Sequence, residues 1–209
     1  MMDVAVVPAS AQERIEALAT AAGWRAVTSE EIPAEAKTAL EVVRKGTPVL
    51  LVPDETRIPK RLKRIVVLHE GTRADRAGVD AADDVALRTR AEVIVLHVPG
   101  PVGDATAATL AFRLADRGTD DWAEWREEFL RRFCRCSPGV RVTLHVAPTD
   151  PDEIATRIRG ERPDLVIASG GDTDPRHPAG EALPRIRGLA PLLVVPSLGQ
   201  EKPRRRRRT

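Results

Sequence analysis

The 209-residue sequence contains no tyrosine, and aromatic residues make up only 3% of it. Its two cysteines, Cys134 and Cys136, are too few for a disulfide framework. No segment reaches the roughly 20 consecutive apolar residues that a membrane-spanning helix needs. The start, Met1–Val4, lacks the basic and apolar regions of a secretory signal. We therefore expect a cytoplasmic protein that has no membrane partner.

The sequence also lacks a strong net charge, because 33 lysines and arginines face 31 acidic residues. Six of the basic residues lie in 202–209, so residues 1–201 contain 27 basic and 31 acidic side chains. A mildly acidic body argues against a folded surface that is one broad polyanion-binding face. We expect residues 199–209 to be a disordered Arg-rich tail, whose arginines attract nucleic acid only non-specifically. These consecutive arginines are Arg204, Arg205, Arg206, Arg207 and Arg208.

Short apolar runs alternate with helix-like segments, which predicts an α/β fold with a doubly wound, mainly parallel, Rossmann-like sheet. Residues 1–53 contain three such runs, the last being PVLLVP, and we predict an N-terminal βαβαβ half-unit. Residues 54–63 are typical of a solvated basic linker. The pattern restarts at residue 64 and ends with PLLVVP, which indicates a second domain at 64–198. Because PVLLVP and PLLVVP are similar, each fits the last strand of one repeat.

One predicted helix carries most of the aromatic side chains. Trp122, Trp125, Phe129 and Phe133 recur at intervals of three and four residues, which places them on one helical face. Such a stripe is more typical of a core-facing helix than of a ligand platform, so we predict that it packs on the core.

Three predicted strands end in Leu-His, at His69, His97 and His145. In a parallel sheet the carboxyl ends of the strands are where ligands bind. If the strands are neighbours, about 4.8 Å apart, the three imidazoles could share a metal ion. The commoner arrangement is a strand-end histidine that hydrogen-bonds a nearby loop. We favour the second interpretation and predict no metal site.

No catalytic constellation is found. The loop that begins at Ser169 could hold a phosphate with its backbone amides, but it lacks the Walker lysine and the G-x-G-x-x-G pattern. Asp172 and Asp174 would also bring negative charge to a bound phosphate. The arginines around Cys134 and Cys136 could lower a thiol pKa, yet an isolated C-x-C pair is more often incidental. We therefore expect a protein that is not an enzyme.

Four segments carry a resemblance to the universal stress protein family, over about two thirds of the chain. They are Arg64–Thr72, Ala91–Val98, Pro163–Ser169 and Ala190–Pro196. In order, they resemble the family's first strand with its acidic loop and then its second, fourth and fifth strands. Residues 1–53 resemble a truncated first unit of a tandem member. The resemblance implies a stress-response or regulatory protein, and we expect a homodimer through the apolar last strand, Leu192–Val195.

In nucleotide-binding members of that family, the ends of strands one, two and four contact the nucleotide. The matching positions here are Glu70, Gly71, Thr72, His97, Val98, Ser169, Gly170, Gly171 and Asp172. Ser169 and Asp172 stand where the family's loop motif has glycines. We therefore expect a non-catalytic regulatory protein that lacks strong ATP binding and needs no cofactor. The alternatives are an adenine-nucleotide-binding or hydrolysing protein with a diverged loop, using ATP or AMP with Mg²⁺, and an anionic-partner protein acting through its arginine tail.

Overall fold

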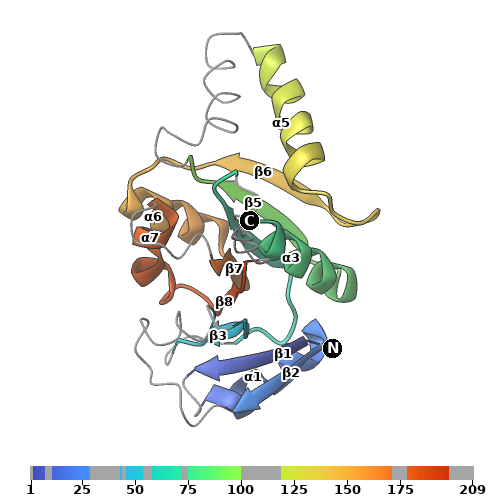
Figure 1. The fold of residues 1–209 in the computed structure, drawn as a ribbon, viewed down its shortest axis with the longest axis vertical. Helices are drawn as coiled ribbons and strands as arrows, with labels where there is room; N and C mark the ends of the chain where they lie inside the picture. The colour runs from blue at the N-terminus through green and yellow to red at the C-terminus, as the bar shows by residue number, and fades with distance from the viewer. Residues whose placement is uncertain are drawn as a thin grey trace, which may run out of the picture.

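The computed structural model describes residues 2–7, 11–28, 43, 46–53, 58–71, 75–99, 119–170 and 178–197. The strands are β1 Met2–Val7, β2 Trp24–Thr28, β3 Val49–Leu51, β4 Arg64–His69, β5 Glu92–His97, β6 Val142–Val146, β7 Leu165–Ser169 and β8 Leu192–Val195. The helices are α1 Gln12–Ala22, α3 Arg76–Thr89, α5 Thr119–Phe133, α6 Pro151–Glu161 and α7 Pro178–Ile186. These strands form one eight-stranded sheet in the order β2-β1-β3-β8-β7-β4-β5-β6 (Figure 1).

Helices cover both faces of this sheet, so the predicted doubly wound α/β class is confirmed. Alternate residues of each strand face opposite sides: in β4, Ile65 and Val67 pack toward α1, α3 and α5, whereas Val66 and Leu68 pack toward α6 and α7. Because β4 and β5 are buried on both faces, their sequences are nearly continuous apolar runs rather than alternating ones.

The strands of the N-terminal half-unit extend the main sheet. Along the sheet, neighbouring strands are parallel except β3 and β8, which are antiparallel. Their register pairs Val49 with Val194 and Leu50 with Leu193, so the two similar segments PVLLVP and PLLVVP lie side by side. The domain boundaries at residues 53, 64 and 198 stay predictions, but strands from both sides share one sheet.

The predicted homodimer through Leu192–Val195 is wrong as a strand-pairing interface. One edge of β8 pairs with β7 and the other with β3 of the same chain. The backbone groups that a second copy would need are therefore already hydrogen-bonded within the chain, and this strand offers no free edge. The open edges of the sheet belong to β2 and β6.

None of the described helices combines the length and the apolar character needed to cross a membrane.

We predict that the chain does not dimerise through β8 unless β3 is displaced. Leu50 is fully buried between β1 and β8. A carboxylate there has no partner and is costly to bury, so Leu50→Asp should detach β3 and expose the apolar edge of β8. In size-exclusion chromatography with light scattering, we expect the variant to stay folded and to form larger species than the wild type.

The matched control is Leu87→Asp, because Leu87 lies on α3 with 50% of its surface exposed. This variant should elute like the wild type. A Leu50→Asp chain that stays folded and monomeric would contradict the protective role of β3.

Candidate functional site

Three polar side chains form a row across the carboxyl ends of β7, β4 and β5. His69 is in register with His97. The parallel strands β4 and β7 pair Val67 with Ile167. Two residues further along each strand, Ser169 therefore lies beside His69. Because side chains alternate along a strand, all three lie on the face covered by α3 and α5. Ser169, His69 and His97 are fully buried, and we call them the strand-end row.

Within this row, the tautomer of His69 follows from its backbone partner. The backbone N–H of Gly71 donates to Nδ1 of His69 at 2.9 Å. A backbone N–H can only donate, so Nδ1 carries a lone pair and the ring proton is on Nε2. Among the described residues Nε2 has no hydrogen-bond partner. This bond confirms, for His69, the expected strand-end histidine that hydrogen-bonds its following loop.

His97 has the opposite tautomer. Its Nδ1 lies 3.0 Å from the carbonyl oxygen of His69, which can only accept, so Nδ1 carries the proton. The same carbonyl also accepts the backbone N–H of Val98 at 2.9 Å. Nε2 of His97 is then a bare lone pair, again without a partner in the described part of the chain.

Both imidazoles are neutral at neutral pH. Burial lowers the pKa of His69, an effect that the nearby Asp75 carboxylate opposes. Burial also lowers the pKa of His97, to about 4. Since a charged ring in an apolar site loses its hydration, the neutral form is the one that fits here.

Helix α5 covers the two histidines with aromatic rings. The ring centroid of Phe129 lies 5.2 Å from that of His69 and 4.8 Å from that of His97. Trp125 lies 6.2 Å from His97, and Phe133 lies 5.8 Å from His69. Trp125 and Phe129 are buried, which confirms a core-facing stripe for these residues. On this face, the two imidazoles are therefore covered by aromatic side chains of α5.

The three strand-end histidines do not converge, so the shared-metal interpretation is wrong. His145 is in register with Leu96 rather than with His97, and it therefore points to the opposite face of the sheet. There its Nδ1 lies 2.9 Å from Glu161 Oε1 and 3.0 Å from the Arg157 guanidinium, both on α6. Within the described ranges, no group of three histidine, cysteine, aspartate or glutamate side chains could hold a metal.

The loop after β4 is tied to the start of α3. The backbone N–H of Glu70 donates to Asp75 Oδ2 at 3.1 Å, and Glu70 is itself buried. Gly71 has φ +87°, a left-handed backbone that glycine adopts without strain. Val98, another predicted site residue, belongs to the core on the α6 side. The predicted contacts Glu70, His97 and Val98 thus do not present their side chains to one common surface.

The end of β7 is also closely packed. The backbone N–H of Gly78 in α3 donates to Ser169 Oγ at 3.0 Å. A Cβ added at Gly170 would lie 3.2 Å from the backbone nitrogen of Ser197 and 3.3 Å from Val43 Cγ1. The first glycine of the predicted phosphate loop is therefore in close contact with Val43 of the N-terminal half-unit and with the segment after β8.

Some predicted site residues cannot be placed. Thr72, Gly171, Asp172, the side chain of Trp122 and the arginine tail lie outside the described residues.

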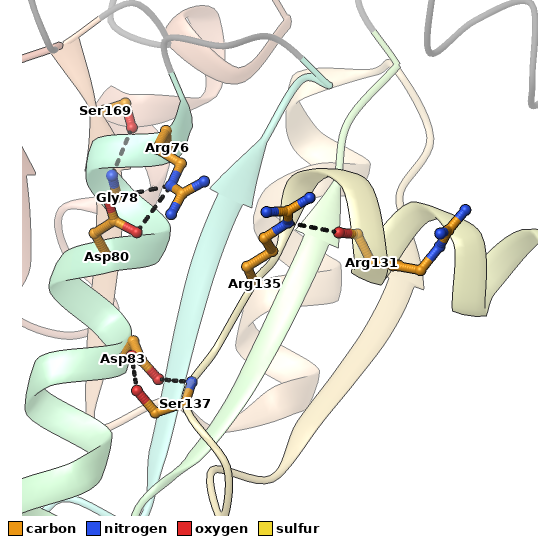
Figure 2. A network of polar contacts seen from close by, with 8 residues as sticks. All are labelled: Arg76, Gly78, Asp80, Asp83, Arg131, Arg135, Ser137 and Ser169. Carbon is orange, nitrogen blue, oxygen red and sulfur yellow. Dashed lines mark hydrogen bonds and ion pairs between the residues drawn. The ribbon is translucent and has the colours of Figure 1, made fainter.

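The sequence did not reveal several of the residues that build this region. Asp75 is the N-cap of α3, and an acidic residue before a helix is a usable signal. Asp83 of α3 accepts the backbone N–H of Ser137 at 2.8 Å and the Ser137 hydroxyl at 2.6 Å. Figure 2 shows this pair joining α3 to the segment after α5. Nothing in the sequence indicates a contact between residues so far apart.

The structure does not support reactive cysteines. Cys134 is buried, and burial raises the pKa of its thiol. Burial, together with the nearby carboxylates of Asp83 and Asp80, raises the pKa of Cys136 to about 11, although Arg76 opposes this. The alternative that neighbouring arginines lower a thiol pKa, which the sequence did not favour, is therefore not supported.

We predict a strong coupling between Gly78 and Ser169. A Cβ at Gly78 would lie 2.8 Å from Ser169 Oγ, a distance that real Cβ atoms do not show. Gly78→Ala should therefore lower the free energy of unfolding by about 1–2 kcal/mol, despite the higher helix propensity of alanine. In urea denaturation, Gly78→Ala combined with Ser169→Ala should lose less stability than the sum of the two single variants.

The matched control is Gly160→Ala in α6, where an added Cβ meets nothing within 4 Å. This change should be neutral or stabilise by up to about 1 kcal/mol. Additive effects of the Gly78 and Ser169 changes would contradict the contact.

We also predict that the native thiols react slowly. With a pKa of about 11 for Cys136, only about one thiol in 1,000 is ionised at pH 8, and the thiolate is the reactive form. Alkylation by iodoacetamide, followed by mass spectrometry, should be slow in buffer and fast in urea. Equal rates in both conditions would contradict the buried placement.

Comparison with known proteins agrees with this architecture. No protein-family model matches the sequence, and no curated protein matches it significantly. A universal stress protein from Archaeoglobus fulgidus aligns with 94% of this chain and 86% of its own, at 15% identity and a TM-score of 0.51. A member of the same family from Burkholderia pseudomallei aligns with 65% of this chain and 97% of its own, at 17% identity and a TM-score of 0.42. The chain thus has the fold of the universal stress proteins.

Proposed function

We propose that the chain is a non-catalytic regulatory protein of the universal stress type, located in the cytoplasm, that does not bind ATP strongly. The observation that carries this proposal is the filled end of the central strands. His69 and His97 are buried under Phe129, and Ser169 is bonded to the first turn of α3. A nucleotide placed on this face of the strands would have to displace side chains that are already buried against one another.

Electrostatics supports the same proposal. The loop after β4 brings the carboxyl groups of Glu70 and Asp75 to these strand ends, and both are buried. Both imidazoles beside them are neutral, so they offer no positive charge to a phosphate. A phosphate without a bound cation would be repelled by these carboxyl groups in a poorly hydrated site, which is unfavourable.

The absence of a nucleophile–base pair in this region also favours a non-catalytic role. A serine or cysteine nucleophile needs a base within hydrogen-bond reach. In the strand-end row, Nδ1 of His69 is taken by Gly71 and Nδ1 of His97 by a carbonyl, while both Nε2 atoms lack partners among the described residues. Within the described ranges, neither imidazole is therefore bonded to a hydroxyl or a thiol.

One observation favours the alternative, an adenine-nucleotide-binding protein. From neighbouring strands, β4 leads to α3 on one face of the sheet, and β7 leads to α7 on the other. Such a switch point is where open α/β sheets bind ligands. A nucleotide there would use Glu70, Gly71 and Gly170 together with the unplaced Thr72, Gly171 and Asp172.

An anionic partner recognised by Arg204–Arg208 is compatible with both functions. Five consecutive arginines attract phosphates without sequence preference and in a salt-dependent manner. Deletion of residues 202–209 should then reduce RNA and DNA retention at low salt without changing the fold, whereas unchanged retention would exclude this partner.

We predict that calorimetric titration of the full chain with ATP or AMP, with and without Mg²⁺, gives no micromolar binding. The physical reason is that the strand ends are occupied by His69, His97 and Phe129. Micromolar binding that depends on Mg²⁺ would contradict the proposal and support the nucleotide alternative.

A matched variant separates specific binding from attraction by the tail. Gly170→Asp adds a carboxylate at the predicted phosphate loop, whereas deletion of residues 202–209 removes only the tail. Binding that Gly170→Asp abolishes and the deletion leaves intact would assign the nucleotide to the strand ends. The opposite pattern would assign it to the arginines.

A further inference from the structure

Helix α5 is fastened to the sheet mainly by aromatic rings that rest on two ionisable side chains. Phe129 lies against both His69 and His97, and Phe133 and Trp125 extend the contact on either side. Figure 1 shows α5 at one end of the molecule, with its N-terminal end pointing away from the sheet. The described anchoring of this helix therefore depends on the state of two histidines.

Each histidine is held in its neutral form, His69 by a backbone donor at Nδ1 and His97 by the burial of its ring. A second proton on His69 would have to go to Nδ1, which already accepts the backbone N–H of Gly71 at 2.9 Å. Two donors would then face each other, and the bond would be lost. A second proton on His97 would go to Nε2, which lies in the buried site without an acceptor in the described part of the chain.

The groups around the pair compensate a positive charge only in part, since burial outweighs the effect of the Asp75 carboxylate on the pKa of both rings. From the start of α3, Asp75 Oδ2 lies 3.3 Å from His69 Nδ1, but it also accepts the backbone N–H of Glu70. The loop after β4 contributes the buried Glu70, and the segment after α5 contributes Cys134, whose thiol is neutral. Strand β7 contributes the Ser169 hydroxyl.

On α5 itself, the contacts with the two imidazoles are aromatic rings. Among the side chains of this helix that the structure describes, Arg131 and Arg132 are exposed and both pair with Glu128. No carboxylate of the described helix is therefore placed to neutralise a protonated His97.

We propose that α5 is an acid-released cover: proton uptake by His69 and His97 shifts this helix from a docked to an undocked state and uncovers the ends of β4 and β5. The inference does not depend on whether the chain binds a nucleotide. It rests on the contacts of Phe129 with the buried rings of His69 and His97. The neutral tautomer of His69 is fixed by the N–H of Gly71, and that of His97 by the carbonyl of His69.

The direction of the pH effect follows from linkage. In the docked state burial lowers the pKa of His97 to about 4, whereas a solvated histidine titrates near its ordinary value of 6.5. The undocked state therefore binds the proton more tightly. Docking is fully favoured above pH 6.5 and weakens as the pH falls from 6.5 toward 4. At pH 5 the opening equilibrium should rise about 30-fold through His97 alone, and further through His69.

The test is amide hydrogen exchange of the full chain, read by mass spectrometry between pH 7.5 and pH 5. After correction for the intrinsic effect of pH, peptides from Thr119–Phe133 should lose protection by about 30-fold or more. Peptides from α6 and β7 should keep theirs. An equal loss of hydrogen-exchange protection in α5 and α6 would overturn the proposal.

Two variants locate the effect. His97→Phe keeps a ring against Phe129 and cannot titrate, and the His69 carbonyl keeps its bond from Val98. This variant should lose the part of the acid response that His97 carries, about 30-fold at pH 5. His145→Asn changes a histidine on the other face of the sheet and should leave the response unchanged. An unaltered response in His97→Phe would overturn the proposal.

A measurement on the unmodified protein keeps the test decisive if His97→Phe does not fold. The ring carbon shifts of His97 in an NMR titration give its pKa directly. We expect a value well below the ordinary 6.5 of a solvated histidine. A value for His97 near 6.5 would show that the docked helix tolerates the charge, and it would overturn the proposal.

Discussion

The antiparallel pairing of β3 with β8 is the interaction on which the rest of the structure depends. It joins the strands of 1–53 to those of 64–198 and makes both cores continuous across the junction. On one face Val6, Leu50 and Leu193 belong to the same buried cluster, and on the other Val49 and Val194 share a cluster. A second copy could offer the same backbone groups only by displacing β3. The N-terminal half-unit therefore takes the place of a partner strand.

This junction also affects the candidate site. It brings Val43 onto Gly170 and supports the packing of α1 beside α3. The end of β7 is then confined between the N-terminal half-unit on one side and the first turn of α3 on the other. Such packing disfavours the opening of this loop to admit a phosphate. In a close-packed interior, moving the loop would also displace the residues packed against it.

The sequence predicted the strands and the polar strand ends well, because buried parallel strands are continuous apolar runs with clear limits. It could not predict which histidines meet. His69, His97 and His145 follow leucine in the same way, but the β5–β6 register pairs His145 with Leu96, and this offset of one residue sends it to the other face. The antiparallel β3–β8 pair was equally hidden, since similar segments PVLLVP and PLLVVP do not reveal their relative direction. Contacts such as Asp83 with Ser137 depend on the same long-range arrangement.

His69 and His97 are fully buried, which is unusual for an ionisable side chain and calls for an explanation. In both strands the four residues before the histidine are isoleucine, valine or leucine. Each histidine leaves one ring nitrogen without a partner among the described residues. An unsatisfied buried polar atom costs about 1–3 kcal/mol. Leucine or phenylalanine would avoid that cost and would pack equally well against Phe129. For stability alone, then, apolar residues would serve better at the base of α5. What the imidazoles add is sensitivity of this contact to protons, at the point where Phe129 of α5 rests on the strand ends.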